Sequence, residues 1–270
     1  MLIVNADDLG YSPHRDAGIF ECFSKNCLSS ASLMVNGPTA ESAARQAAKV
    51  GLFLGLHLNL TEGVPLADVP QLTRPNGLMY YKDDFIALRA DRLCPESVIQ
   101  EARAQIIKFK QLTGAFPVHV DGHQHVHVLR GMAELLAPLF QEYGVLSTRV
   151  PDEDISTYSW MSHARRQKYE SLFPMMVNAR IIYKKHGINA PCSFIGLGLG
   201  GLQLTPEHFK RCRELSFGTT ELMVHPGHLS LDIKKTFCDP FDISPDRLYE
   251  CQSLPLLLRS ETLCDWRILQ

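Results

Sequence analysis

Short apolar runs alternate with segments of helical periodicity along the whole chain. The runs predict buried strands at residues 2–5, 32–35, 52–60, 117–121, 147–150, 192–197 and 221–225. Helices are expected at residues 15–24, 40–49, 95–112, 132–143, 158–186, 206–214 and 245–258, with Pro174 interrupting the fifth of them. Strand–helix alternation predicts an α/β fold with a parallel sheet inside a layer of helices. Seven candidate strands favour a deformed, TIM-barrel-like (β/α) barrel over an open doubly wound sheet.

One long segment, residues 61–93, interrupts this alternation. It contains several prolines, the pair Asn76-Gly77 and the aromatic residues Tyr80, Tyr81 and Phe85, without a clear period. Segments of this length without regular structure are commonly lids or binding loops. Because it follows the third expected strand, we expect it to emerge on the face of the barrel where catalysis takes place.

The composition is that of an ordinary globular enzyme. Of 270 residues, 45% are hydrophobic and 21% are charged, and no linker divides the chain, so residues 1–270 are expected to form one domain. The formal net charge is -2 with both signs interspersed. Without a basic stripe to bind phosphates, nucleic acid is not an expected partner.

Targeting signals and paired cysteines are not evident. The first residues lack a basic region followed by a long apolar stretch, and no uncharged run has the length of a membrane span. The eight cysteines are scattered without a C-x-x-C pair, which gives little support to a zinc–thiolate site. We therefore expect a soluble cytoplasmic protein with reduced thiols and no membrane partner.

Polar side chains gather where the expected strands end. They are Asp7 and Asp8 after the first strand, Asn36 after the second, His57 and Asn59 late in the third, Asp121 and His123 at the end of the fourth, Arg149 in the fifth, and His225 and His228 at the last. The carboxyl ends of the strands of a parallel barrel meet on one face. Carboxylates and imidazoles from different strands could there surround a divalent cation such as Zn²⁺, Mn²⁺, Co²⁺ or Mg²⁺, among which the residues do not choose.

Taken singly, these residues also have plain structural interpretations. The Asp7-Asp8 pair is compatible with a turn and a helix cap, and His57 in its apolar run with a hydrogen-bonded core histidine. His225 is compatible with a strand-end residue. In VHVDGHQHVHV a period of two would place one Asp and four His residues on one side, where some would orient ligands or lie at the surface: His119, Asp121, His123, His125 and His127.

Together these segments resemble the YdjC-like carbohydrate deacetylases, which include the diacetylchitobiose deacetylases. The matching stretches are NADDLG (5–10), SASLMVNG (30–37), GLHLNLTEG (55–63), HVDGHQHVH (119–127) and ELMVHPGH (221–228). They occur in order over nearly the whole chain. The chain departs from the family at Leu9, where Phe is frequent, and matches it poorly over residues 61–93 and 152–191, so the sugar stays undetermined.

The resemblance implies a deformed β/α barrel and one divalent metal ion, with Mg²⁺ expected first and Zn²⁺ as the alternative. It implies Asp8, His57 and His123 as metal ligands, Asp7 as catalytic base and His225 as the general acid that protonates the leaving amine. The implied substrate is an acetylated amino sugar or short chitooligosaccharide, with Tyr80, Tyr81 and Phe85 available either for stacking on sugar faces or for core packing.

Two other classes remain open on the sequence. A different metal hydrolase on the same barrel, a phosphoesterase or an amidohydrolase, would be expected to have more basic residues near the site than Arg149 alone. A non-catalytic metal- or sugar-binding relative would not require a carboxylate such as Asp7 beside the ligands. The oligomeric state is also open, with a homodimer as one alternative, as are the roles of His119, His125, His127 and His228.

Overall fold

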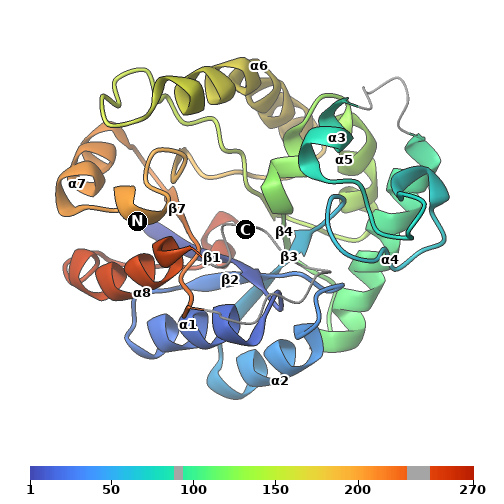
Figure 1. Cartoon of the computed structure of the whole chain (residues 1–270), viewed down its shortest axis with the longest axis horizontal. Helices are drawn as coiled ribbons and strands as arrows, with labels where there is room; N and C mark the ends of the chain where they lie inside the picture. The colour runs from blue at the N-terminus through green and yellow to red at the C-terminus, as the bar shows by residue number, and fades with distance from the viewer. Residues whose placement is uncertain (88–93, 230–243) are drawn as a thin grey trace.

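The computed structural model describes residues 1–87, 94–229 and 244–270. Its centre is one parallel sheet of seven strands in the order β5-β4-β3-β2-β1-β7-β6. The strands are β1 (Leu2–Leu9), β2 (Ser30–Leu33), β3 (Phe53–Leu58), β4 (His119–Gly122), β5 (Ser147–Thr148), β6 (Ser193–Ile195) and β7 (Thr220–Val224). The sheet curls into a half-barrel within a ring of helices, which confirms the predicted α/β barrel class (Figure 1).

Helices connect successive strands and pack on the outside of the sheet. They are α1 (Pro13–Ser24), α2 (Ala40–Val50), α3 (Lys82–Ala87), α4 (Pro95–Thr113), α5 (Met132–Glu142), α6 (His163–Lys185), α7 (Pro206–Leu215) and α8 (Pro245–Leu257). Four short 3-10 turns are η1 (Pro70–Leu72), η2 (His123–Val128), η3 (Gly201–Gln203) and η4 (Trp266–Leu269). In the part of the chain the structure describes, no helix combines the length and apolarity needed to cross a bilayer.

Three predictions about the elements need correction. The expected helix at 158–186 begins only at His163, after the Ser162 cap, and runs through Pro174 without a break. Its buried face, with Leu172 before the proline and Met176 and Tyr183 after it, holds the helix against the core on both sides of the proline. Arg149 lies just after β5 rather than in it, and β1 extends through Asp7 and Asp8 rather than ending before them. The short helix α3 was not anticipated.

The concave interior of the sheet is polar. Side chains two residues apart on neighbouring strands form one hydrogen-bonded network: Asn5 and Asp7 on β1, Ser30 and Ser32 on β2, His57 on β3, and His119 and Asp121 on β4. Below the network, the buried Trp266 stacks on His119 with ring centroids 3.5 Å apart and donates to the Asn5 side chain. The C-terminal segment around Trp266 thus supports the polar interior from the amino end of the strands, where the Cys264 N–H donates to the backbone oxygen of Leu2.

A buried carboxyl group beyond β5 makes the stability of the fold depend on pH. Glu153 accepts hydrogen bonds from the backbone N–H groups of Gly196 and Leu197 and from the Tyr158 hydroxyl. Burial raises the pKa of Glu153 from 4.5 to about 7 despite these bonds.

A carboxyl group whose pKa is higher in the folded chain stabilises the fold below its unfolded pKa, and this contribution is lost as pH rises through the folded pKa. We expect Glu153 to contribute a fall of about 2 to 3 kcal/mol in the free energy of unfolding between pH 4.5 and 7. In urea unfolding, the difference in the free energy of unfolding between the parent protein and Glu153→Gln should shrink by this amount as pH rises across the range. The exposed Glu170→Gln is the control, and an unchanged profile in Glu153→Gln would contradict the assignment.

Candidate active site

A β-bulge places two neighbouring carboxylates at the same end of β1. Between Ala6 and Leu9 the register with β2 shifts, so β1 contains one more residue than its partner strand. Asp8 has a φ of +64°, in the left-handed region that Asp tolerates better than most residues. Alternation along a regular strand would send Asp7 and Asp8 to opposite faces. The bulge instead gives each carboxylate its own set of partners at the carboxyl edge of the sheet.

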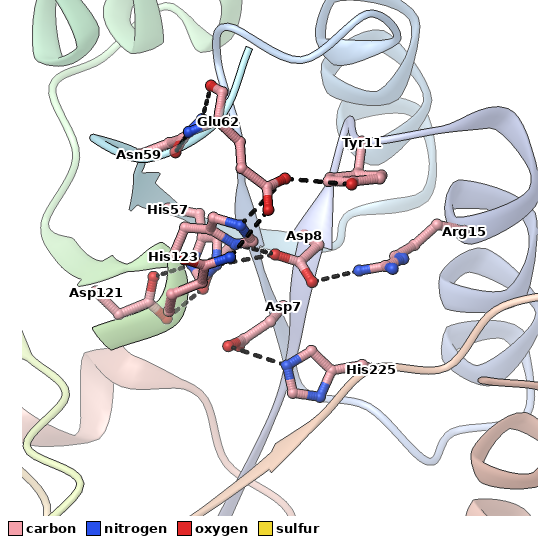
Figure 2. A network of polar contacts seen from close by, with 12 residues as sticks. Asp7, Asp8, Tyr11, Arg15, His57, Asn59, Glu62, Asp121, His123 and His225 are labelled. Carbon is pink, nitrogen blue, oxygen red and sulfur yellow. Dashed lines mark hydrogen bonds and ion pairs between the residues drawn. The ribbon is translucent and has the colours of Figure 1, made fainter. Parts of the chain in front are cut away.

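Asp8 lies beside two histidines from other strands. Its Oδ1 is 2.8 Å from Nδ1 of His123 and 3.1 Å from Nε2 of His57 (Figure 2). The other oxygen of Asp8 pairs with the guanidinium of Arg15 on α1. One ligand atom from each of Asp8, His57 and His123 lies within 4.8 Å of the others, and all three side chains are buried.

Each histidine has a second carboxylate behind it. Nδ1 of His57 is 2.7 Å from Asp121 Oδ1, and Nε2 of His123 is 3.6 Å from Glu62 Oε2. Glu62 is itself held by the Tyr11 hydroxyl at 3.2 Å and by the Gln124 amide at 2.9 Å. Carboxylates in these positions are the usual means by which metal-ligating histidines are oriented.

Asp7 has different partners. Arg149 donates to both of its oxygens, with Nη1 2.5 Å from Oδ2 and Nη2 2.6 Å from Oδ1. His225 Nε2, from the segment after β7, is 3.7 Å from Oδ2 (Figure 2). Arg149 is fully buried and also pairs with Asp121 and Glu221, so its one positive charge faces three carboxyl groups. The bidentate contact fixes the orientation of the Asp7 carboxylate.

The electrostatics at Asp8 favour an anion surrounded by cations. Burial raises the pKa of the Asp8 carboxyl, but Arg15 and His123 outweigh this and hold the pKa well below its usual value. Burial would lower the pKa of His123, whereas the charges of Asp8 and Glu62 raise it to about 9. The site therefore favours positive charge at the His123 position.

His57 is subject to the same balance of effects. Burial lowers its pKa, and the charges of Asp121 and Asp7 reverse this and raise the pKa to about 10. Burial raises the pKa of Asp121, but Arg149 and His57 hold it well below its usual value. Both imidazoles thus favour the cationic form in the absence of metal, and a divalent cation can replace those two positive charges.

The donor set fits a divalent cation. It offers one carboxylate oxygen and two imidazole nitrogens without sulfur, a combination that Zn²⁺, Mn²⁺ and Co²⁺ accept and that Mg²⁺ accepts less readily at its nitrogens. His57 presents Nε2 to Asp8 and His123 presents Nδ1, so both ring nitrogens converge on the same carboxylate oxygen. Asp8, His57 and His123 could together hold such an ion. A second group, Asp7, His57 and Asp121, shares His57 but is engaged by Arg149.

The expectation that five alternate residues of VHVDGHQHVHV share one side is wrong beyond β4. The strand ends at Gly122, and η2 follows, with Gln124 and His125 at positive φ. His127 turns away and its Nε2 bonds the backbone oxygen of Arg149 at 2.8 Å. His125 is buried edge-on to Phe194. His119 points into the polar interior as described above, so these three histidines pack and orient neighbouring groups.

The segment at residues 61–93 contacts the site at its first residues. Glu62 reaches His123, and Met79 N–H bonds the backbone oxygen of Gly63 at 2.8 Å, which ties the aromatic part of the segment to this point. Phe85 is buried in the core, so its role is packing. Tyr80 is half-buried, whereas Tyr81 is 52% exposed under the guanidinium of Arg74. Residues 88–93 lie outside the described residues.

Several residues of the site were not anticipated. Arg15, Glu62 and Tyr11 come from a helix and loops, where the sequence shows no periodic signal for them. Asn5, Ser32 and Glu221 could have been recognised from the sequence, because each is a polar residue within a largely apolar strand segment. Asn36 and Asn59 do lie near the site, where Asn59 bonds the backbone oxygen of Glu62 at 2.8 Å.

Comparison with known families places this barrel in one of them. The family model of YdjC-like proteins matches residues 1–258. The chain is 36% identical to a carbohydrate deacetylase of Mus musculus, over 98% of this chain and 90% of that protein. It is 29% identical to a chitooligosaccharide deacetylase of Serratia marcescens, over 89% of this chain and 87% of that protein. The chain therefore belongs to the YdjC-like family, which confirms the resemblance drawn from its motifs.

The fold has a counterpart among solved structures. A chain from Enterococcus faecalis, named as a candidate cellobiose-phosphate cleavage protein, superposes with a TM-score of 0.77. The match covers 99% of this chain and 98% of that chain at 22% sequence identity. At that identity the likeness establishes a shared fold over the full length of both chains.

Proposed function

We propose that this protein is a metal-dependent carbohydrate deacetylase that hydrolyses the N-acetyl group of an amino sugar or a short chitooligosaccharide. One observation carries the proposal: the bulge in β1 separates two adjacent carboxylates, with Asp8 facing His57 and His123 and Asp7 facing Arg149 and His225. A ligand set beside an independent base is what amide hydrolysis requires. The similarity to carbohydrate and chitooligosaccharide deacetylases supports the choice of substrate.

Asp8, His57 and His123 would hold the ion, with Mg²⁺ and Zn²⁺ as the two candidates. When bound, the ion supplies a Lewis acid that polarises the acetamide carbonyl and acidifies water. The residues of the chain account for the proton transfers. Asp7, oriented by Arg149, accepts a proton from the water that attacks the carbonyl carbon.

The second half of the reaction requires an acid. When the carbon–nitrogen bond breaks, the departing nitrogen must be protonated, because an amide anion is a very poor leaving group. His225 lies across from Asp7 and can donate this proton from a partly exposed ring. The products are acetate and the free amino sugar.

Release of acetate is the direct test. The full-length protein, stripped with chelator and reloaded with Mg²⁺ or Zn²⁺, should release acetate from N-acetylated chitobiose, and chelator should abolish this release. Phosphorylated sugars test the alternative of a phosphoesterase in the same assay. Phosphate release without acetate release from any acetylated sugar would overturn the proposal.

We further propose that residues 61–87, the described part of the segment 61–93, act as a lid that contributes to sugar selection, with Tyr81 as a stacking surface. Tyr81→Ala is expected to raise KM for chitooligosaccharides by roughly 5-fold with little change in the unfolding temperature, since the ring is exposed and stacking is worth about 1 kcal/mol. Phe217→Ala is the matched control, because Phe217 is exposed just before β7, at the opposite end of the strands. Equal KM values in Tyr81→Ala and the parent protein would exclude the stacking role.

A further inference from the structure

A second group of metal-ligating side chains lies between α1, α8 and the segment after β7. It comprises Glu21 on α1, Cys251 on α8 and His228, and one ligand atom of each lies within 4.8 Å of the others. Nε2 of His228 is 2.7 Å from Glu21 Oε2. None of these three residues belongs to the group around Asp8, and His228 is a histidine to which the proposed deacetylation assigns no role.

The three segments are held in fixed relative positions by their backbones. His228 N–H bonds the backbone oxygen of His14 on α1, and Gly227 N–H bonds that of Arg247 on α8. A Cβ built at Gly18 would lie only 2.4 Å from the Gly227 Cα, so α1 and this turn pack in direct backbone contact. The ligand atoms therefore come from a rigid junction, which reduces the entropy lost when an ion binds.

The chemistry of the three donors differs from that of the first site. Cys251 is buried, with its sulfur 3.6 Å from the Cys22 sulfur and 3.8 Å from the backbone oxygen of Gly18, and a cysteine that binds a metal ion does so as the thiolate. Glu21 and His228 are partly exposed above it, and Lys25 engages the other oxygen of Glu21, leaving Oε2 on the side of His228. One thiolate, one carboxylate and one neutral imidazole together carry two negative charges.

We propose that Glu21, His228 and Cys251 form a binding site for a thiophilic divalent cation of the Zn²⁺ class, separate from the site around Asp8. Sulfur, nitrogen and oxygen ligands in one set suit Zn²⁺ and exclude Mg²⁺, and the two negative charges neutralise the ion. The cation enters from solvent by replacing the hydrogen bond between Glu21 and His228. Because the ligands are far apart in the sequence, no spacing motif reveals the set.

A bound ion would clamp the segments on which two residues of the deacetylase site depend. α1 also contains Arg15, the partner of Asp8, and the turn before His228 begins at His225, the partner of Asp7. The clamp would stabilise these positions without contacting the reacting groups. Its presence can be tested independently of deacetylation, because the group around Asp8 contains no sulfur.

Substitution with Co²⁺ shows directly whether a sulfur atom binds the metal ion. The full-length protein, stripped with chelator and kept reduced with a phosphine, is titrated with Co²⁺ and followed by its near-ultraviolet sulfur-to-cobalt charge-transfer absorption. We expect the band in the parent protein and in Asp8→Asn, and we expect its loss in Cys251→Ser. Cys212→Ser, a buried cysteine on α7, is the matched control that should keep the band.

Absence of the band from the parent protein, or its survival in Cys251→Ser, would overturn the proposal. If Cys251→Ser does not fold, the partly exposed His228 provides a second test. In an Asp8→Asn background, where the first site is disabled, Zn²⁺ should raise the unfolding temperature. The additional change His228→Ala should weaken Zn²⁺ binding by roughly 10-fold or more and remove that rise. An unaltered Zn²⁺ response would also overturn the proposal.

Discussion

We expect His57→Ala and His123→Ala each to lose bound metal and deacetylase activity together. Either change leaves two protein ligands out of three, too few to hold a catalytic ion. The loss of metal affinity should exceed the roughly 10- to 100-fold that follows when only the partner behind a ligand is removed. Metal analysis of the purified variants, beside acetate release at saturating metal, measures both quantities.

Asp121→Asn provides the graded comparison, because Asp121 contacts Nδ1 of His57 behind the site. It should weaken metal binding by roughly 10- to 100-fold and keep activity at high metal concentration. His186→Ala, a histidine at the end of α6 whose ring contacts Gln141, is the control that should change neither quantity. Full metal occupancy in His57→Ala or His123→Ala would remove that histidine from the proposed ligands.

Metal binding should also depend on pH in a defined direction. Without metal, the pKa values of His57 and His123 are raised to about 10 and about 9, so both imidazoles are protonated at neutral pH. A metal ion must displace those protons, and the apparent affinity should therefore increase as pH rises from 7 toward 9. Calorimetry in buffers of different ionisation enthalpy would detect the released protons, and an affinity that fell over this range would contradict the assignment.

The order and location of the main elements could be predicted from the sequence because burial in a parallel sheet imposes a simple pattern. All seven strands lie within a few residues of the apolar runs, and caps such as Pro95 and Gly114 bound α4 as expected. The failures have local causes. Packing overrides the break expected at Pro174, and left-handed backbone at Gln124 and His125 ends the strand pattern. The spacing of hydrophobic residues predicts neither the tertiary packing around a proline nor a left-handed backbone conformation.

The candidate site could be predicted only in part for a related reason. Asp8, His57 and His123 end three different strands, and the parallel topology alone brings strand ends together. The residues that orient them are less regular: Arg15 comes from a helix and Glu62 from a loop, and their contacts depend on how those segments turn back over the sheet. The motif ELMVHPGH likewise shows that His225 and His228 are close in sequence, but not that they face different sites.

The bulge in β1 allows the roles within the Asp7-Asp8 pair to be separated by experiment. Asp8 contacts both histidines, whereas Asp7 contacts Arg149 and faces His225. If Asp7 is the base, Asp7→Asn should keep the metal and the fold but lower kcat by roughly 10² to 10⁴, the usual share of general base catalysis. Asp8→Asn should instead weaken metal binding, since an amide oxygen is a poorer ligand than a carboxylate.

Arg149 makes the Asp7→Asn test more demanding, because the neutral amide leaves a buried guanidinium with one fewer carboxylate. Stability must therefore be measured beside activity, and Asn5→Ala, which also removes a contact to Asp7 without removing a carboxylate, is the matched control. The acid limb of the pH profile of kcat/KM should disappear in Asp7→Asn and persist in Asn5→Ala, because that limb reports the free enzyme's base. Near-normal turnover of Asp7→Asn at saturating metal would reject Asp7 as the base, and loss of metal from Asp7→Asn but not from Asp8→Asn would reverse the two assignments.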